Sequence, residues 1–293
     1  MTRVNFEQLL EAGAHFGHLK RKWNPNMAPY IFMEKNGIHI IDLHKTVIKT
    51  EEACKVLQHI ARSGKKILFV STKKQAKEII AEHVKAVNMP YVTERWAGGM
   101  LTNFNTIRKA VKKMSTIDNL MKSPEWNSIS KRERLQIQRE RAKLEKNLGS
   151  ISDLTRLPAA VFVVDIMKEH IAVAEARKLD IPIFAIVDTN SNPNLVDYPI
   201  PANDDASKSI AVIIKAVCEA IQEGLNEKSL DSDKEEEEEI VEKDIIDKAD
   251  EEEEEEKSER TGRRRRRIGE ASGDASSMDE KKKRPSKRPV SKK

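Results

Sequence analysis

The chain has few aromatic residues (4%), only two cysteines and no long apolar run among its 293 residues. Cys54 and Cys218 both lie in apolar, helix-like stretches, which favours buried thiols over a disulfide or a metal site. No apolar stretch approaches the roughly 20 residues that cross a bilayer, and no signal peptide follows Met1. We therefore expect a soluble, cytoplasmic protein without a membrane partner.

Glycine is missing where a nucleotide-dependent enzyme needs it. The segment 65–71, whose apolar residues are Ile67–Val70, predicts a strand, and Thr72-Lys73-Lys74-Gln75 predicts a capping box that opens the next helix. Dinucleotide sites and P-loops carry glycines at such a turn so that the backbone can approach the phosphates. Here Lys73 and Lys74 take their place, either to reach phosphate from a helix N-terminus or simply to face solvent.

Charge is distributed very unevenly along the chain. The net charge is −14 over 229–259 and +10 over 260–293, which leaves +9 for 1–228. A basic globular part favours a polyanion partner. The segment 229–293 has too few apolar residues to bury a core, so we expect an acidic-then-basic tail that is disordered when free. Its acidic block is suited to fold back on the basic block, or to compete with RNA for basic surfaces.

The segment from Pro158 to Asp188 has the clearest pattern of secondary structure. Continuous apolar runs at 159–164 and 181–187 predict strands covered on both faces, and the three- and four-residue apolar spacing between them predicts a helix. Together they form a parallel βαβ unit, which should have a right-handed crossover. Asp165 and Asp188 end the two strands, where α/β folds bind ligands. We interpret both aspartates as turn and cap residues, with a chemical role as the alternative.

Shorter patterns predict the remaining elements of an α/β domain. Asp42 follows a short strand and caps a helix over 43–62. The proline-rich segment Tyr198–Pro201 suits an edge strand better than a central one. A last helix follows and ends near Gly224.

Two further helices are predicted in the middle of the chain. Apolar residues near heptad spacing follow Phe104, and a second series follows the capping box Ser130–Glu133. A short turn with Pro124 joins them, which predicts an antiparallel helical hairpin. Its apolar stripe is thin and its charge is high, so we expect it to project from the α/β body and to reach RNA.

Basic and aromatic residues gather in the loop at 20–24, the turn at 73–74, the segment 95–103 and the first hairpin helix. Lysine and arginine can contact phosphates, while tryptophan can stack on a base. For both loop tryptophans the alternative is a lid or plug on the core. The candidate RNA-binding residues are Lys20, Arg21, Lys22, Trp23, Asn24, Lys73, Lys74, Arg95, Trp96, Gly98, Gly99, Asn103, Lys109, Lys112 and Lys113.

Four histidines near the N-terminus suggest a metal site only weakly. The spacing of His15 and His18 is compatible with chelation, but no cysteine or carboxylate lies beside them in the sequence. His39 and His44 lie in or next to a predicted strand and helix. We therefore assign no metal ligand and no catalytic residue from the sequence.

Separated motifs occur in a fixed order along residues 1–227. They are the run Leu9–His18, Trp23-Asn24-Pro25, Arg95-Trp96 with Gly98-Gly99, Leu101-Thr102-Asn103, the segment Pro158–Pro182, Asp188-Thr189-Asn190 and Asn203-Asp204-Asp205. In this order they resemble the bacterial small-subunit ribosomal protein two family. Ala97 departs from the larger aliphatic residue of that family, and nothing carries over to the tail beyond Lys228.

The resemblance implies a flavodoxin-like three-layer αβα fold with a mainly parallel sheet and a protruding antiparallel coiled-coil hairpin. Members of the family lie on the solvent side of the small ribosomal subunit, between head and body. They contact small-subunit rRNA and neighbouring ribosomal proteins, and they dock ribosomal protein one, which captures mRNA. The resemblance therefore implies a structural constituent of the ribosome that supports translation initiation, with no enzymatic activity and no small-molecule substrate.

We expect an α/β globular domain over 1–102 and 150–228, a coiled-coil hairpin over 103–149 and a disordered tail over 229–293. The alternative function is an α/β enzyme or phospho-switch with a metal-phosphate pocket at the strand ends, where Asp42, Asp165 and Asp188 lie and Lys168 follows. No cofactor is assigned. A Mg²⁺ ion shared with rRNA is kept as an option, because Mg²⁺ often binds through one or two carboxylates plus phosphate oxygens. Its ligands would be Asp188, Asp204 or Asp205.

Overall fold

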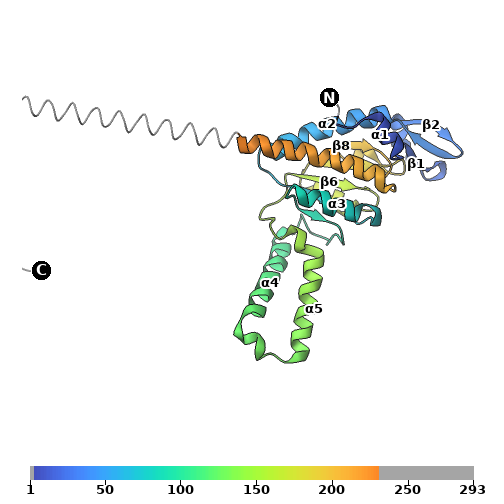
Figure 1. Cartoon of the computed structure of the whole chain (residues 1–293). Helices are drawn as coiled ribbons and strands as arrows, with labels where there is room; N and C mark the ends of the chain where they lie inside the picture. The colour runs from blue at the N-terminus through green and yellow to red at the C-terminus, as the bar shows by residue number, and fades with distance from the viewer. Residues whose placement is uncertain (1–2, 231–293) are drawn as a thin grey trace, which may run out of the picture. The chain divides into compact units, whose positions relative to one another are not determined.

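The computed structural model describes residues 3–230, which Figure 1 traces from the blue N-terminal helix to a long orange helix. The predicted tail lies outside these residues except for its first two positions. Within residues 3–230, no helix has both the length and the apolarity that a membrane span requires. The helices are α1 (Phe6–Glu11), α2 (Leu43–Arg62), α3 (Lys74–Ala86), α4 (Phe104–Lys122), α5 (Lys131–Leu148), α6 (His170–Lys178) and a last one over 207–230.

A five-stranded parallel sheet forms the centre of the domain, so the predicted α/β class is confirmed. The four pairings between neighbouring strands are all parallel. The predicted βαβ unit is present as β6, α6 and β7, and the proline-rich segment is the edge strand β8. The strands, in their order across the sheet, are β5 (Tyr91–Val92), β4 (Ile67–Val70), β6 (Ala160–Val164), β7 (Ile183–Val187) and β8 (Tyr198–Pro201).

Each face of this sheet packs against its own apolar core, because neighbouring residues of a strand point to opposite faces. On one face, Phe69 and Phe162 pack with α2, α3 and the helix over 207–230. On the other face, Leu68 and Val161 pack with α6 and with Ile151 at the foot of the hairpin. The two cores explain why the central strands are apolar at every position and show no alternation.

The last helix continues past the predicted end at Gly224 and reaches residue 230. Gly224 was interpreted as a helix stop, and this is wrong. A Cβ atom at Gly224 would lie 2.4 Å from the carbonyl oxygen of Gln58 on α2. The glycine is therefore required where the two helices approach closely, and it does not end the helix.

A second, three-stranded antiparallel sheet near the N-terminus was only partly predicted. Its order is β1 (Phe16–Leu19), β3 (Ile38–Ile41) and β2 (Ile31–Lys35). β2 and β3 pair antiparallel around Asn36 and Gly37, which both have positive φ angles, of 53° and 75°. Asn-Gly with two positive φ angles is the preferred two-residue turn of a β-hairpin. Residues 16–19, for which no element was predicted, pair with β3 as an edge strand.

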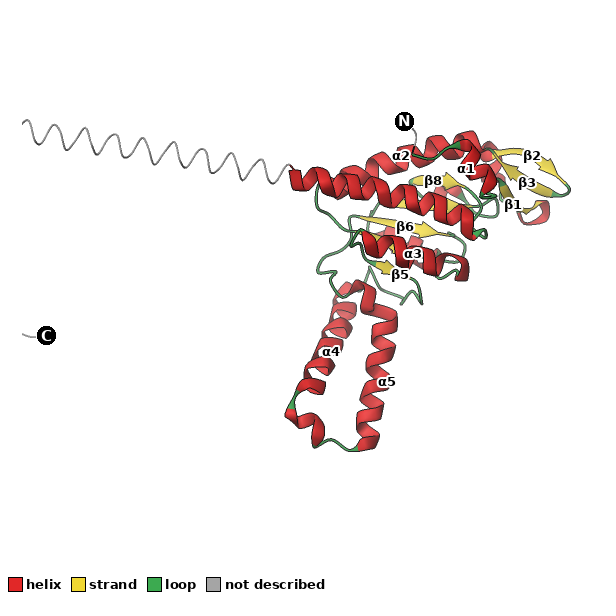
Figure 2. Cartoon of the chain, viewed as in Figure 1, coloured by secondary structure: helices red, strands yellow, loops and turns green. Residues whose placement is uncertain are grey.

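The helices α4 and α5 lie side by side and antiparallel. α4 leads away from the parallel sheet and α5 returns toward it (Figure 2). A short 3₁₀ segment, Pro124–Asn127, lies between them. The Ser130 side chain accepts a hydrogen bond from the Glu133 N–H, so the predicted N-cap of α5 is present. Arg141 on α5 forms an ion pair with Asp118 on α4.

Candidate functional site

A cluster of charged side chains forms where the parallel strands end. β4 leads to Lys73, β6 to Asp165 and β8 to Asp204 and Asp205. The Lys73 Nζ atom lies 2.6 Å from Asp204 Oδ1, 2.8 Å from Asp205 Oδ1 and 3.1 Å from Asp165 Oδ2. Because carboxyl ends of parallel strands meet at one edge of a sheet, residues far apart in the sequence form one ionic network there.

Burial and the excess of carboxylates over amines control which groups of this network are protonated. Asp204 is fully buried, and burial together with the charges of Asp188 and Asp165 raises its pKa to about 7. Burial lowers the pKa of the Lys73 amine, but the Asp204 charge and the hydrogen bonds to Asp204 and Asp205 outweigh it and raise that pKa above its usual value. Lys73 therefore stays charged and is held by carboxylates.

Lys73 is consequently not placed as the sequence suggested. Its side chain is only 11% exposed, whereas the neighbouring Lys74 is exposed at the first position of α3. The predicted capping box at Thr72–Gln75 is also wrong. Lys73 is the N-cap residue without a side-chain cap, and the Thr72 N–H donates to the buried Glu169 Oε1 at 2.6 Å.

His18 joins the same end of the sheet from the edge strand β1. Its Nδ1 atom lies 2.9 Å from Asp188 Oδ2, and its backbone N–H donates to Thr189 Oγ1 at 2.7 Å. The hydrogen bond to Asp188 is the largest influence on the pKa of His18 and raises it above its ordinary value. Gly17 allows this approach, since a Cβ there would lie 2.6 Å from the Thr189 Cγ2 atom.

The geometry brings together one group that could bind a metal within the described residues. His18, Asp188 and Asp204 each present one ligand atom, and these atoms lie within 4.8 Å of one another. The Oδ2 atom of Asp204 is buried and has no hydrogen-bond partner. The sequence suggested Asp188 and Asp204 as Mg²⁺ ligands but not His18, which lies 170 residues before Asp188 and meets it only through the sheet.

Asp165 acts as a turn residue, as interpreted from the sequence, whereas the Asp188 side chain pairs with His18. Asp165 has a φ angle of 70°, and its Oδ1 accepts the Met167 and Lys168 N–H groups at 2.9 and 3.2 Å. The proposed metal-phosphate pocket is not assembled. Asp42 instead caps α2 through the His44 N–H, and Lys168 donates to the Thr72 carbonyl.

We expect the free energy of unfolding to fall as the pH rises from about 6 to 8. His18 has a raised pKa when folded, so its ion pair stabilises fully below the unfolded pKa near 6.5 and is lost above the folded one. Asp204 also holds its proton better when folded, so its ionisation near pH 7 acts in the same direction. Urea titrations at the two pH values measure this, and His18→Gln should flatten the dependence. A pH slope unaltered by that substitution would contradict the assignment.

The loop at 20–24 contributes exposed cations and a partly covered tryptophan. Lys20, Arg21 and Lys22 are exposed, and Lys20 Nζ lies 2.7 Å from Glu34 Oε2. The Trp23 ring packs on His39 with ring centres 5.0 Å apart. Asn24 begins a 3₁₀ helix, with its side chain accepting from the Asn26 N–H. Trp23 and Asn24 thus support the loop, whereas the three cations face solvent.

The segment 95–103 is organised by a residue that was not predicted. Glu175 on α6 is buried, and its Oε1 accepts from Trp96 Nε1 at 3.1 Å and the Gly99 N–H at 2.7 Å. Its Oε2 accepts from the N–H groups of Leu101 and Thr102 at 2.9 and 3.1 Å, and from Thr102 Oγ1 at 3.2 Å.

These contacts separate the predicted RNA-binding residues of this segment. Trp96 is 7% exposed, so the alternative of a tryptophan plug is correct and base stacking on it is not. Gly99 has a φ angle of 83° and directs its N–H to Glu175, so it has a structural role. Arg95, Gly98 and Asn103 remain exposed.

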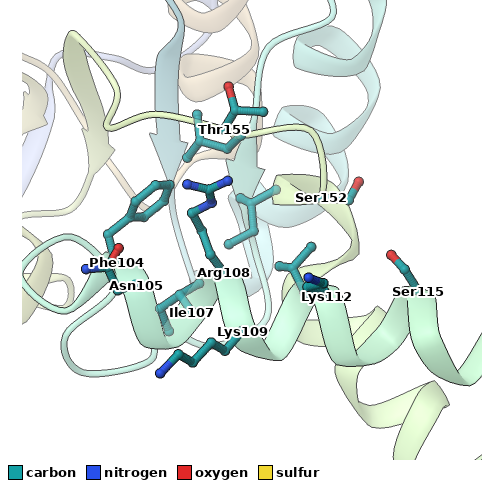
Figure 3. A pocket seen from close by; sticks show the side chains of 12 residues that line it. Phe104, Asn105, Ile107, Arg108, Lys109, Lys112, Ser115, Ser152 and Thr155 are labelled. Carbon is teal, nitrogen blue, oxygen red and sulfur yellow. The ribbon is translucent and has the colours of Figure 1, made fainter. Parts of the chain in front are cut away.

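An open hollow of about 560 Å³ lies between α4 and residues 151–155 at the foot of the hairpin (Figure 3). Lys109 and Lys112 of the predicted set line it, together with Arg108. Lys113 does not line it, and its amine forms an ion pair with Glu140 on α5. The hairpin lysines therefore fall into two groups, on the hollow and between the helices.

Comparisons with known proteins agree with this architecture. The family model described as ribosomal protein S2 matches residues 9–224. The chain is 68% identical over 231 residues to the small ribosomal subunit protein uS2 of Parabacteroides distasonis, covering 79% of this chain and 83% of that protein. The uS2 proteins of Azobacteroides pseudotrichonymphae and Porphyromonas gingivalis are 68% and 67% identical, each over 79% of this chain and over 88% and 82% of their own lengths. These relatives are ribosomal proteins and not enzymes, and the chain belongs to the ribosomal protein S2 family.

Proposed function

We propose that the chain is a structural constituent of the small ribosomal subunit and binds small-subunit rRNA. The observation that carries this proposal is the family match, which spans both the α/β body and the hairpin. Its location would then be the ribosome in the cytoplasm. Its partners would be rRNA and neighbouring small-subunit proteins, including ribosomal protein one, whose docking supports translation initiation.

The charge distribution favours rRNA as the direct partner. Several exposed cations form no ion pair with any residue in the described part of the chain, so they are available to phosphates. They lie in the 20–24 loop, at the start of α3, in the 95–103 segment and on α4. These cations are Arg21, Lys22, Lys74, Arg95, Arg108, Lys109 and Lys112.

The finer architecture belongs to the same proposal. The order of the parallel sheet strands, counted along the chain as 2-1-3-4-5, is the order of flavodoxin-like folds, and helices cover both faces. We assign the α/β body to 1–102 and 150–228 and a coiled-coil hairpin to 103–149. The disordered tail expected from residue 229 is not supported at its first two positions, because residues 229 and 230 belong to the last helix. Residues 231–293 lie outside the described part.

Sedimentation tests the main proposal. The tagged full chain should be expressed in a bacterium such as Parabacteroides distasonis, whose uS2 protein it resembles. It should migrate with small ribosomal subunits in a sucrose gradient and should remain with them after a moderate salt wash. Recovery of the chain only in the free fraction would contradict the proposal. Loss of ribosomal protein one from subunits depleted of this chain would test the docking role separately.

Neutralising the 20–24 loop should weaken rRNA binding in a salt-dependent way. Removal of one phosphate-binding cation lowers the slope of log K against log salt by about 0.7–0.9. Because Lys20 is partly neutralised by Glu34, we expect the substitution of Lys20, Arg21 and Lys22 by glutamine to have the effect of removing about two such cations. Filter binding to small-subunit rRNA at several salt concentrations measures the slope. An unchanged slope would exclude this loop from the interface.

A further inference from the structure

The hollow at the foot of the hairpin has an apolar floor and a cationic edge. Its floor consists of Phe104, Ile107 and Val111, which share one face of α4, and of Ile151 and Leu154 across from them. These side chains extend the core beneath the parallel sheet. The floor is therefore rigidly supported and remains open on one side.

The polar groups around the floor carry positive charge and hydrogen-bonding capacity but no carboxylate. Figure 3 shows the Phe104 and Arg108 side chains pointing from α4 toward the segment that carries Ser152 and Thr155, while Lys109 leads away. The one acidic residue within that segment, Asp153, lines a different hollow, and its Oδ1 accepts a hydrogen bond from Ser152 Oγ at 3.3 Å.

The ion pairing of the cations along α4 indicates which kind of ligand the hollow binds. Lys113 is neutralised by Glu140, whereas Arg108 and Lys112 form no ion pair with the described residues. An anion is therefore favoured on the hollow side of the helix and not on the side that faces α5.

We propose that this hollow binds an unstacked nucleotide of RNA, with its base against Phe104 and its phosphate at Arg108 and Lys112. The inference rests on the proposed rRNA binding and makes it specific. Paired RNA presents phosphates to a protein but keeps its bases stacked inside the helix, so it would leave the apolar floor empty. An extruded base has an apolar face for Phe104 and a polar edge for the amide of Asn105, the next lining residue along α4.

Two RNA probes test the proposal on the full chain: a stem with one bulged uridine, and the same stem fully paired. Stacking of one base on an aromatic ring is worth about 1–3 kcal/mol, so we expect the bulged stem to bind roughly tenfold tighter. Phe104→Leu, which keeps apolar volume but removes the ring, should bring the two affinities together. Arg108→Gln, at an exposed side chain, should weaken both RNAs and lower the salt slope by about one.

Lys113→Gln is the matched control on the same helix, and it should preserve the ratio of the two affinities. Equal affinity of the unsubstituted chain for the two stems, or a preference that survives Phe104→Leu, would overturn the proposal. If both stems then still bind with a salt dependence, the proposed rRNA binding stands. If neither binds, both fail. Displacement of the bulged stem from the hollow by an acidic peptide, at a lower concentration than the paired stem requires, would assign the hollow to a protein partner and also overturn the inference.

Discussion

Replacing Lys73 by methionine should lower the free energy of unfolding by about 3–5 kcal/mol, because it removes the ammonium group that pairs with two buried carboxylates, those of Asp165 and Asp204. Asp204 has no exposed side-chain surface, and Asp165 is nearly buried. Without Lys73, Asp204 would have to stay charged out of water or take up a proton, because the Lys73 charge lowers its pKa, and Asp165 would keep only its backbone hydrogen bonds. Methionine matches the length of the lysine stem, so packing contributes little to the loss.

The neighbouring Lys74 provides the control for this substitution. Lys74→Met changes the same residue type at an exposed position, where surface substitutions usually alter stability by no more than about 0.5 kcal/mol. Urea denaturation of the two variants at pH 8 measures the difference. The deficit of Lys73→Met should shrink below pH 7, because Asp204 can then be protonated.

Lys73→Met also separates two roles that the sequence could not distinguish. If Lys73 contacted phosphate, the folded variant would show a smaller salt slope in rRNA binding. The observed ion pairs predict an unchanged slope for the folded fraction and a loss of stability instead. Equal stability of the Lys73 and Lys74 variants would show that the carboxylate network contributes little to the fold.

The sequence predicted the parallel sheet well because burial on both faces leaves a pattern that is readable without partners. The runs that became β6 and β7 are apolar at every position, and the prolines of β8 marked it as an edge. The two-residue strand β5 has no such pattern, since it pairs on one side only with β4. The β2–β3 hairpin was missed, although Asn36-Gly37 was a usable local signal.

The charged network could not be predicted, because it depends on strand order. Lys73, Asp165 and Asp204 become neighbours only when β4 pairs with β6 and β8 lies beyond β7. Thr72 shows the same limit at shorter range. The local capping pattern was present, but the Thr72 N–H donates to the distant Glu169 carboxylate and not to Gln75 as a capping box would require.

Glu175 illustrates a residue that looks ordinary in a helix and acts on another segment. A single glutamate among the alanines of α6 gave no signal in the sequence, yet five hydrogen bonds end on its carboxylate. These bonds fix Trp96 and the residues that lead directly into α4. The direction of the hairpin, and with it the hollow beside Phe104, therefore depends on one carboxylate.

Glu175→Gln should lower the free energy of unfolding by about 2–5 kcal/mol. An amide of the same shape can accept hydrogen bonds at one oxygen only, and each buried donor left unpaired costs about 1–3 kcal/mol. The hydrogen bonds hold the pKa of Glu175 below its usual value despite burial. Its contribution is therefore complete above the unfolded pKa near 4.5 and is lost as the pH falls through the folded one, so the deficit should shrink in acid. Urea denaturation at pH 7 and below pH 4.5 measures both effects.

Trp96→Phe tests how much of the stabilisation by the Glu175 carboxylate comes from its hydrogen bond with the Trp96 ring. The phenyl ring keeps most of the apolar packing but removes one of the five donors, so the loss should be smaller than for Glu175→Gln. In the double variant, Trp96→Phe should lower the free energy of unfolding by less than it does as a single substitution, because Trp96 and Glu175 share one interaction. Full additivity of the two losses would show that Trp96 is held by packing alone. In that case Glu175 would position the start of α4 only through the backbone N–H groups of Gly99, Leu101 and Thr102 and the Thr102 hydroxyl.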